Sequence, residues 1–224
     1  MRSIIITGSE GLLGSELCKF FEKESKILKL DIIRGQDLTD ESFVKKWFRD
    51  HHADNLINCF ALNDHISKKR NKETLYDFPL SRFYDYMNIN LISLFSVCRE
   101  FAMNNKRGSI VNFSSYLGLV SPRPDMYNNS HKDIGYTVSK FGVIGLTKYL
   151  AVHLAPRIRV NCISPGGILD KQSKEFVKKY SKLTPMARMM KKKELNHLVD
   201  YLCSDKSSYM TGENITVDGG YVSW

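Results

Sequence analysis

The chain has 224 residues, of which 42% are hydrophobic and 25% charged, and its formal net charge is +9. These values are typical of a globular protein, and we expect one domain over residues 1–224. No apolar run approaches the roughly 20 residues of a transmembrane helix, and the first residues lack a signal-peptide pattern. We therefore expect a cytoplasmic protein without membrane contact. The basic residues are scattered and not interleaved with aromatic ones, which favours an anionic small-molecule substrate over nucleic acid.

The cysteines and histidines indicate neither a disulfide framework nor a metal site. The cysteines are odd in number, lack a CxxC spacing and each lie in an apolar pattern, so we expect buried thiols. They are Cys18, Cys59, Cys98, Cys162 and Cys203. The six histidines form no HxxxH or HExxH group. We predict no metal.

In chain order, apolar runs alternate with segments of helical periodicity. Strands are predicted at 3–7, 26–33, 54–62, 109–115, 158–164 and 214–220. Helices are predicted at 11–25, 37–52 (with Thr39 or Asp40 as N-cap), 81–105, 133–151, 172–182 and 191–203. This alternation predicts an α/β fold, a parallel sheet covered by helices on both faces. Two polar stretches, at about 64–80 and 116–135, are predicted to be loops.

A glycine-rich turn, "TGSEGLLG" (7–14), joins the first strand to the first helix. Small residues there let the backbone approach a pyrophosphate, and the helix N-terminus offers free N–H groups. Asp31 follows at the end of the second strand, where a carboxylate can accept hydrogen bonds from ribose hydroxyls and would repel a 2′-phosphate. NAD(H) is therefore favoured, although nearby Arg34 leaves NADP(H) open.

Tyr136 and Lys140 are four residues apart in a predicted helix, so they share one face. One such pair is expected by chance in a chain with this many tyrosines and lysines, so the pair alone proves nothing. Its position decides the matter, because it follows "IVNFSS", precedes "RVNCISPGG" and lies downstream of the glycine turn.

These motifs, in this order, resemble those of the short-chain dehydrogenases/reductases along nearly the whole chain. The series includes "LINCFA", "NINLISLF", "GSIVNFSS", "RVNCISPGGI" and "YMTGENITVDGG". The resemblance implies a Rossmann-type doubly wound sheet and a homodimer or homotetramer formed through helices near 85–105 and 136–153. The ending "VDGGYVSW" is similar, more weakly, to members from bacterial surface-sugar and flagellin-glycan pathways.

The resemblance also implies a catalytic tetrad of Asn90, Ser115, Tyr136 and Lys140. Tyr136 would exchange a proton with the substrate oxygen, and the Lys140 ammonium would lower the pKa of its phenol. Ser115 would donate a hydrogen bond to the reacting oxygen. Asn90 would support a water that links Lys140 to solvent. Outside this context, each residue would have an ordinary structural role.

The cofactor site implied by the resemblance extends over five segments of the chain. Its residues are Thr7, Gly8, Ser9, Gly11, Leu12, Leu13, Gly14, Asp31, Asp37, Leu38, Asn58, Ala61, Tyr136, Lys140, Pro165, Gly166, Gly167 and Ile168. Asn58 and Asn161 match family positions that mainly brace the site. Asp37 matches an acidic residue beside the adenine ring, but it is nearly as well explained as a turn residue before Thr39.

Several departures from the family pattern carry information. Only six residues separate Asp31 from Asp37, so the helix between strands 2 and 3 of ordinary members is predicted to be missing, and the sheet to lose or shorten a strand. The threonine that usually follows the "PGG" segment is absent until Thr184. The loop before Tyr136 is eight residues longer than usual, and we expect Arg123 or His131 of this loop to help bind a polar substrate. Solvated loop charge explains both residues at least as well.

The sequence therefore predicts an NAD(H)-dependent oxidoreductase that interconverts a secondary alcohol and a ketone, with a sugar or sugar phosphate as the first candidate substrate. Two alternatives stay open. One is an epimerase or dehydratase with tightly bound NAD, and the other is a regulatory member that binds nucleotide without turnover.

Overall fold

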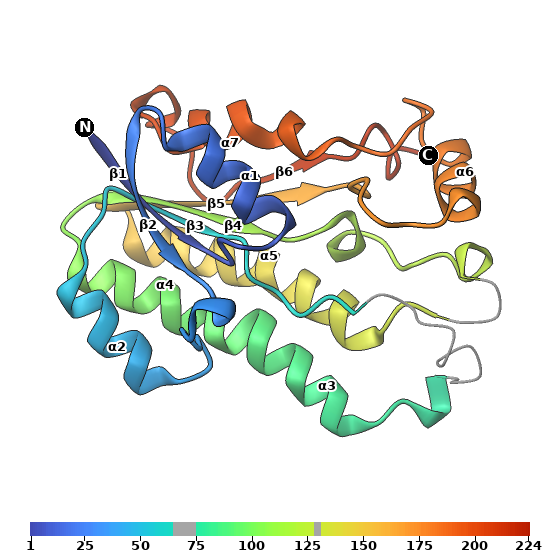
Figure 1. The fold of residues 1–224 in the computed structure, drawn as a ribbon, viewed down its shortest axis with the longest axis horizontal. Coiled ribbons are helices and arrows are strands. Elements are labelled where there is room, and N and C mark those ends of the chain that lie inside the picture. The colour runs from blue at the N-terminus through green and yellow to red at the C-terminus, as the bar shows by residue number, and fades with distance from the viewer. Residues whose placement is uncertain (65–74, 128–130) are drawn as a thin grey trace.

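A computed structural model of the protein describes residues 1–64, 75–127 and 131–224. Its core is one sheet of six parallel strands in the order β2-β1-β3-β4-β5-β6 (Figure 1). The strands are β1 (Arg2–Thr7), β2 (Ser25–Leu30), β3 (Asn55–Asn58), β4 (Gly108–Phe113), β5 (Ile158–Pro165) and β6 (Asn214–Val217). The predicted α/β fold with a doubly wound parallel sheet is confirmed.

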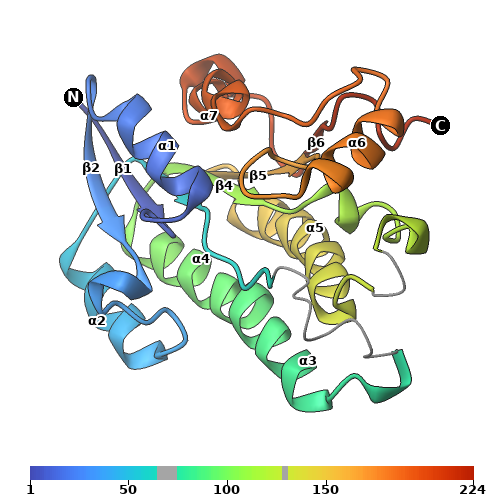
Figure 2. The same cartoon turned by 45° about the vertical axis from the view of Figure 1, so that its right-hand side comes forward.

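Helices cover both faces of the sheet, with α1 and α7 on one face and α2, α4 and α5 on the other (Figure 2). Their bounds are α1 (Leu12–Phe21), α2 (Glu41–Asp50), α3 (Leu80–Met87), α4 (Ser93–Asn104), α5 (Ile134–Leu154), α6 (Lys174–Lys182) and α7 (Asn196–Leu202). The sequence of β1 is continuously apolar because the strand is buried on both faces of the sheet. Ile5 packs toward α2 and α4, whereas Ile4 and Ile6 pack toward α1 and α7, and all three are fully buried. Among the described residues, no helix combines the length and apolarity needed to cross a membrane.

The second strand ends earlier than predicted, at Leu30, because Asp31 caps a short 3₁₀ turn (Ile32–Arg34) by accepting a hydrogen bond from the Ile33 N–H at 2.9 Å. The chain then enters α2 directly, with Asp40 as the N-cap that accepts from two backbone N–H groups. The predicted absence of a helix between Asp31 and Asp37 is confirmed, and of the two alternatives for the strand the structure shows its loss. Strand β2 consequently forms one edge of the sheet.

The predicted helix over 81–105 is interrupted in its middle. Helix α3 passes into a π-helical turn, Asn88–Ile92, before α4 begins. Such turns occur mostly as single insertions in α-helices and often at functional sites. Here the insertion contains Asn90, one of the four predicted catalytic residues.

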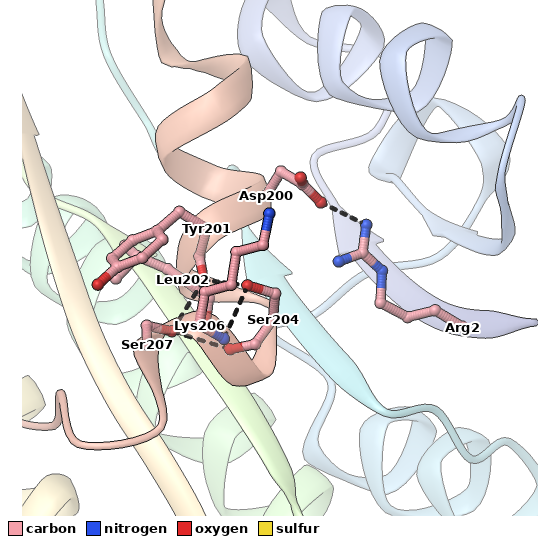
Figure 3. Close-up of polar contacts among 7 residues, drawn as sticks. All are labelled: Arg2, Asp200, Tyr201, Leu202, Ser204, Lys206 and Ser207. Atoms are coloured by element: carbon pink, nitrogen blue, oxygen red, sulfur yellow. Dashed lines mark hydrogen bonds and ion pairs between the residues drawn. The ribbon is translucent and has the colours of Figure 1, made fainter.

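From β1 the chain crosses to β2 on one side and returns to β3 on the other, so the strand order reverses between β1 and β3. Ligands of open α/β sheets bind at the carboxyl ends of the strands at such a point. At the opposite end of the sheet, Arg2 of β1 forms an ion pair with Asp200 of α7 at 2.6 Å (Figure 3). The end of α7 is closed locally, because the Ser207 hydroxyl donates to the Tyr201 carbonyl at 2.8 Å. These contacts stabilise the scaffold away from the predicted site.

Candidate active site

The glycine turn lies at the carboxyl end of β1, where its backbone approaches neighbouring backbone too closely for larger residues. Gly8 has φ of +64°, and a Cβ there would lie 2.6 Å from the Phe60 nitrogen. A Cβ on Gly14 would lie 2.0 Å from the Gly8 carbonyl oxygen. The hydroxyl of Ser9 is buried and has no hydrogen-bond partner. The start of α1 has no side-chain cap, so its free N–H groups and the buried Ser9 hydroxyl fit the diphosphate of a dinucleotide.

Asp31 lies directly after β2 and contacts the glycine turn. One carboxylate oxygen accepts the Glu10 N–H at 2.9 Å, and the other accepts the Ile33 N–H. The carboxylate therefore links the glycine turn to the 3₁₀ turn that follows β2. Each oxygen retains a lone pair for a further donor such as a ribose hydroxyl. The Glu10 carboxylate lies 3.4 Å from the Arg34 guanidinium. The cation that could attract a 2′-phosphate is thereby paired with an acidic residue of the glycine turn.

The adenine-side predictions have two outcomes. The Asp37 carboxylate accepts hydrogen bonds from the Thr39 N–H and hydroxyl at 2.9 and 2.8 Å, which is the turn-residue role. The Leu38 side chain is buried in the core, so only its backbone is available to a nucleotide.

A buried hydrogen-bond chain fixes the ends of β1, β3 and β4. The Thr7 hydroxyl lies 3.1 Å from the Asn58 amide oxygen, the Asn58 amide donates to Asn112 at 2.9 Å, and Asn112 donates to the Thr147 hydroxyl at 3.0 Å. Asn58 thus joins β3 to its two neighbouring strands. Asn161 braces the C-terminal segment in the same way, since it donates to the Met210 carbonyl at 2.9 Å.

Asn90 fixes the segment that follows β3, next to Ala61. Its side chain accepts the Leu62 N–H at 2.7 Å, donates to the Leu62 carbonyl at 3.1 Å and donates to the Ser139 hydroxyl at 3.0 Å. It therefore ties the π turn to both the segment after β3 and α5. This bracing role was not foreseen from the sequence.

Ser115, Tyr136 and Lys140 converge beyond the carboxyl end of β4. Ser115 caps a 3₁₀ turn, and its side chain hydrogen-bonds to the Tyr136 phenol. One turn further along α5, the Lys140 ammonium donates to the Phe113 carbonyl at 2.9 Å and lies 5.6 Å from the centre of the Tyr136 ring. All three residues are buried. The structure thus brings together the residues predicted for proton transfer.

The electrostatics of the pair differ from the expectation. Burial raises the pKa of the Tyr136 phenol, and the hydrogen bond from Ser115 opposes this effect only in part. Burial also lowers the pKa of Lys140 from 10.5 to about 8. The expected lowering of the phenol pKa is not seen, because burial outweighs the favourable hydrogen bond.

The "PGG" segment continues from β5 and contacts other parts of the protein closely. A Cβ on Gly166 would lie 2.9 Å from Asp218, and a Cβ on Gly167 would lie 2.9 Å from the Tyr180 ring. The Gly167 N–H donates to the Tyr180 hydroxyl at 2.6 Å. These glycines therefore make room for protein atoms. Thr184 donates to the Tyr180 carbonyl near the end of α6, so it does not replace the threonine missing from this segment.

The two predicted substrate residues have different surroundings. Arg123 is exposed and pairs with Asp125 at 3.4 Å, which is the solvated-loop role. The Nε2 atom of His131 is buried without a hydrogen-bond partner, and its ring lies 6.3 Å from Phe78. The basic residues of the other loop, His65, Lys68, Lys69 and Arg70, lie outside the described residues.

Comparison with known proteins agrees with this geometry. A family model described as enoyl-(acyl carrier protein) reductase matches residues 14–222. The chain is 30% identical to post-translational flagellin modification protein A of Campylobacter coli, over 94% of this chain and 83% of that protein. The chain belongs to the short-chain dehydrogenase/reductase family.

Two further relatives of this short-chain dehydrogenase/reductase share its family but no named substrate. A short-chain dehydrogenase structure from Leptospira borgpetersenii with bound NAD⁺ superposes with a TM-score of 0.84 at 30% identity, covering 98% of this chain and 92% of that one. D-arabinitol 2-dehydrogenase (ribulose-forming) of Scheffersomyces stipitis is 33% identical, over 78% of this chain and 64% of that protein. The names of these relatives differ in substrate, so they show the family and not the substrate.

Sequence reasoning missed several residues that this member of the family places around Tyr136. Tyr86 of α3 lies edge-on to the Tyr136 ring at 6.4 Å, and its hydroxyl donates to the Asp133 carboxylate at 2.8 Å. Lys132 lies over the Tyr136 ring. The Tyr86 contact joins distant parts of the chain and left no signal, but Lys132 precedes Tyr136 by four residues and was visible in the spacing.

Proposed function

We propose that this protein is an NAD(H)-dependent oxidoreductase that interconverts a secondary alcohol and a ketone. The observation that carries the proposal is the convergence of the Tyr136 phenol, the Ser115 hydroxyl and the buried Lys140 ammonium, in a chain whose glycine turn leaves the start of α1 uncapped. Residues of the glycine turn and Asp31 would hold the cofactor. The nicotinamide, when bound, supplies the hydride acceptor or donor.

Within this site the protein residues handle only the proton and the substrate oxygen. Ser115 donates a hydrogen bond to that oxygen and orients it. During oxidation, the Tyr136 phenolate takes the hydroxyl proton; during reduction, the phenol returns it. Lys140 donates to the Phe113 carbonyl one helical turn beyond Tyr136, and its stem fixes that side of the site. Asn90 keeps the segment after β3 in place beside this pair.

The cofactor proposed is NAD(H) in preference to NADP(H). The Asp31 carboxylate stands at the end of β2, and Glu10 both adds negative charge to the turn and pairs with Arg34. A 2′-phosphate would meet two carboxylates there. Fluorescence titration should therefore give tighter binding of NADH than of NADPH, and Glu10→Gln should narrow the difference. Equal binding of both cofactors by the wild-type protein would count against this preference.

A polar, anionic substrate, a sugar or sugar phosphate, completes the proposal. It is supported by the basic balance of the chain and by the lysine beside Tyr136. The test is a panel of sugars, sugar alcohols and their phosphates, assayed with NAD(H) by NADH absorbance. Tyr136→Phe should abolish turnover without weakening NADH binding. Turnover that persists in Tyr136→Phe, or bound NAD with no net NADH formation, would point to another reaction.

The proposal extends to a cytoplasmic homodimer or homotetramer. Helices α4 and α5 lie on one face of the sheet and expose several large apolar side chains. These are Phe95, Met103, Val138, Phe141, Tyr149 and Val152. Light scattering should give two or four times the chain mass for the wild-type protein. Phe141→Glu should lower this mass toward that of one chain. A monomeric wild-type protein would contradict the proposal. The free cysteines, mostly buried, suit a reducing compartment.

A further inference from the structure

The catalytic tyrosine has a second lysine beside it, on the opposite side in sequence from Lys140. The Lys132 ammonium lies 4.4 Å from the centre of the Tyr136 ring, whereas the Lys140 ammonium lies 5.6 Å from it. The three residues are spaced as KxxxYxxxK. Lys132 belongs to the segment that is longer here than in ordinary members of the family.

Lys132 is held where it is by a second part of the site. Its ammonium donates to the Asn63 amide oxygen at 2.5 Å and to the Asp64 carbonyl at 3.1 Å. Asn63 and Asp64 follow the segment that Asn90 fixes through Leu62. The Lys132 ammonium is thus held by Asn63 and Asp64, and the backbone of this residue is held by the start of α5, which begins two residues later.

A cation near an aromatic ring face is attracted by the ring quadrupole, and the attraction grows when the phenol loses its proton and the ring carries net negative charge. An opposite charge within about 4–6 Å shifts a pKa by roughly 1–3 units. The Lys140 ammonium is engaged by the Phe113 carbonyl, and its pKa of about 8 means that this charge is lost in mildly alkaline solution. A second cation closer to the ring would stabilise the phenolate independently of Lys140.

We propose that Lys132 is a positioning residue that stabilises the phenolate form of Tyr136 from the ring face. The inference rests on the proposed function in that it assigns Tyr136 the proton transfer. Beside the two lysines, the described side chains that face the phenol are neutral groups and one carboxylate. Ser115 and Tyr86 are neutral partners, and the Asp133 carboxylate, which accepts from Tyr86, lies 3.6 Å from the Arg82 guanidinium. Tyr127, from the loop before α5, also interacts with the phenol and is neutral.

The decisive measurement needs neither substrate nor cofactor. The titration of Tyr136 is obtained from tyrosinate absorbance as the difference between a protein and its Tyr136→Phe counterpart. Lys132→Gln removes the charge and keeps a donor for Asn63, Lys132→Met removes both, and Lys132→Arg keeps a cation. Lys148→Met is the matched control, because Lys148 is an exposed lysine on the same helix, three turns away.

We expect the Tyr136 pKa to rise by about one unit or more in Lys132→Gln and Lys132→Met, and to stay unchanged in Lys132→Arg and Lys148→Met. With an active substrate, the alkaline shift should also appear in the pH profile of oxidation. A wild-type Tyr136 titration in Lys132→Gln overturns the inference and leaves Lys132 as a tie between two loops. Turnover in Tyr136→Phe would instead refute the proposed function, and the titration would still decide the role of Lys132.

Discussion

Lys140 is predicted to make the fold less stable at neutral pH, and this cost should decline as the pH rises. Its pKa falls from 10.5 to about 8 on folding because the ammonium is buried. A tenfold change in proton affinity corresponds to about 1.4 kcal/mol, so the penalty at pH 7 is about 3 kcal/mol. A group with a lowered basic pKa destabilises the folded state while it is charged in both states. The penalty is therefore fully present below pH 8 and declines between pH 8 and 10.5, to about 2 kcal/mol at pH 9.

The test compares wild-type protein with Lys140→Met by urea unfolding at pH 7 and pH 9, followed by tryptophan fluorescence. Loss of the hydrogen bond to the Phe113 carbonyl costs the variant the same at both pH values, so the change with pH isolates the ammonium. We expect the free energy of unfolding of the wild type to rise by about 1 kcal/mol relative to the variant between pH 7 and 9. Lys148→Met, which removes an exposed lysine, should show no such change. A difference between wild type and Lys140→Met that is the same at both pH values would refute the reasoning.

Three further predictions concern the frame of the site. Gly14→Ala should cost several-fold or more in NADH affinity, measured by calorimetry, because its Cβ would lie 2.0 Å from a carbonyl oxygen, whereas Gly145→Ala in open space on α5 should raise the melting temperature slightly. Asn90→Ala leaves two backbone groups after β3 without their partner; urea unfolding should show a loss of about 1–3 kcal/mol, and an unchanged midpoint would contradict the bracing role. Tyr180→Phe leaves the Gly167 N–H without its acceptor, so faster hydrogen exchange is expected at that amide, with α1 as an internal reference.

The parts of the fold that follow from local periodicity were predictable from the sequence. The apolar runs gave the strands, since a strand buried on both faces needs no alternation, and the glycine turn and the Tyr136–Lys140 pair lie where their motifs placed them. The π turn at Asn90 was not predictable, because the sequence there is as helical as its flanks and only packing against Leu62 and Ser139 selects the wider turn.

Long-range contacts explain what the sequence could not supply. The two glycines after Pro165 were predicted to lie in the cofactor site, and the sequence could not show that a Cβ on either would lie 2.9 Å from Tyr180 of α6. The expected effect of Lys140 on the phenol was wrong for a related reason. Helical spacing places the two side chains on one face, yet it does not reveal that both are buried or that the ammonium is directed to the Phe113 carbonyl.

The shortened nucleotide-binding half has a consequence for the surface of the molecule. Without the strand that ordinary members add there, β2 has a row of backbone N–H and C=O groups facing outward, and such an edge can recruit a strand from another chain. Lys26 and Lys29 lie on this six-residue strand, Lys26 exposed and Lys29 half-buried. Charged side chains on a short edge strand discourage intermolecular pairing. The two lysines of β2 therefore lower the tendency of this edge strand to aggregate, where ordinary members have a further strand.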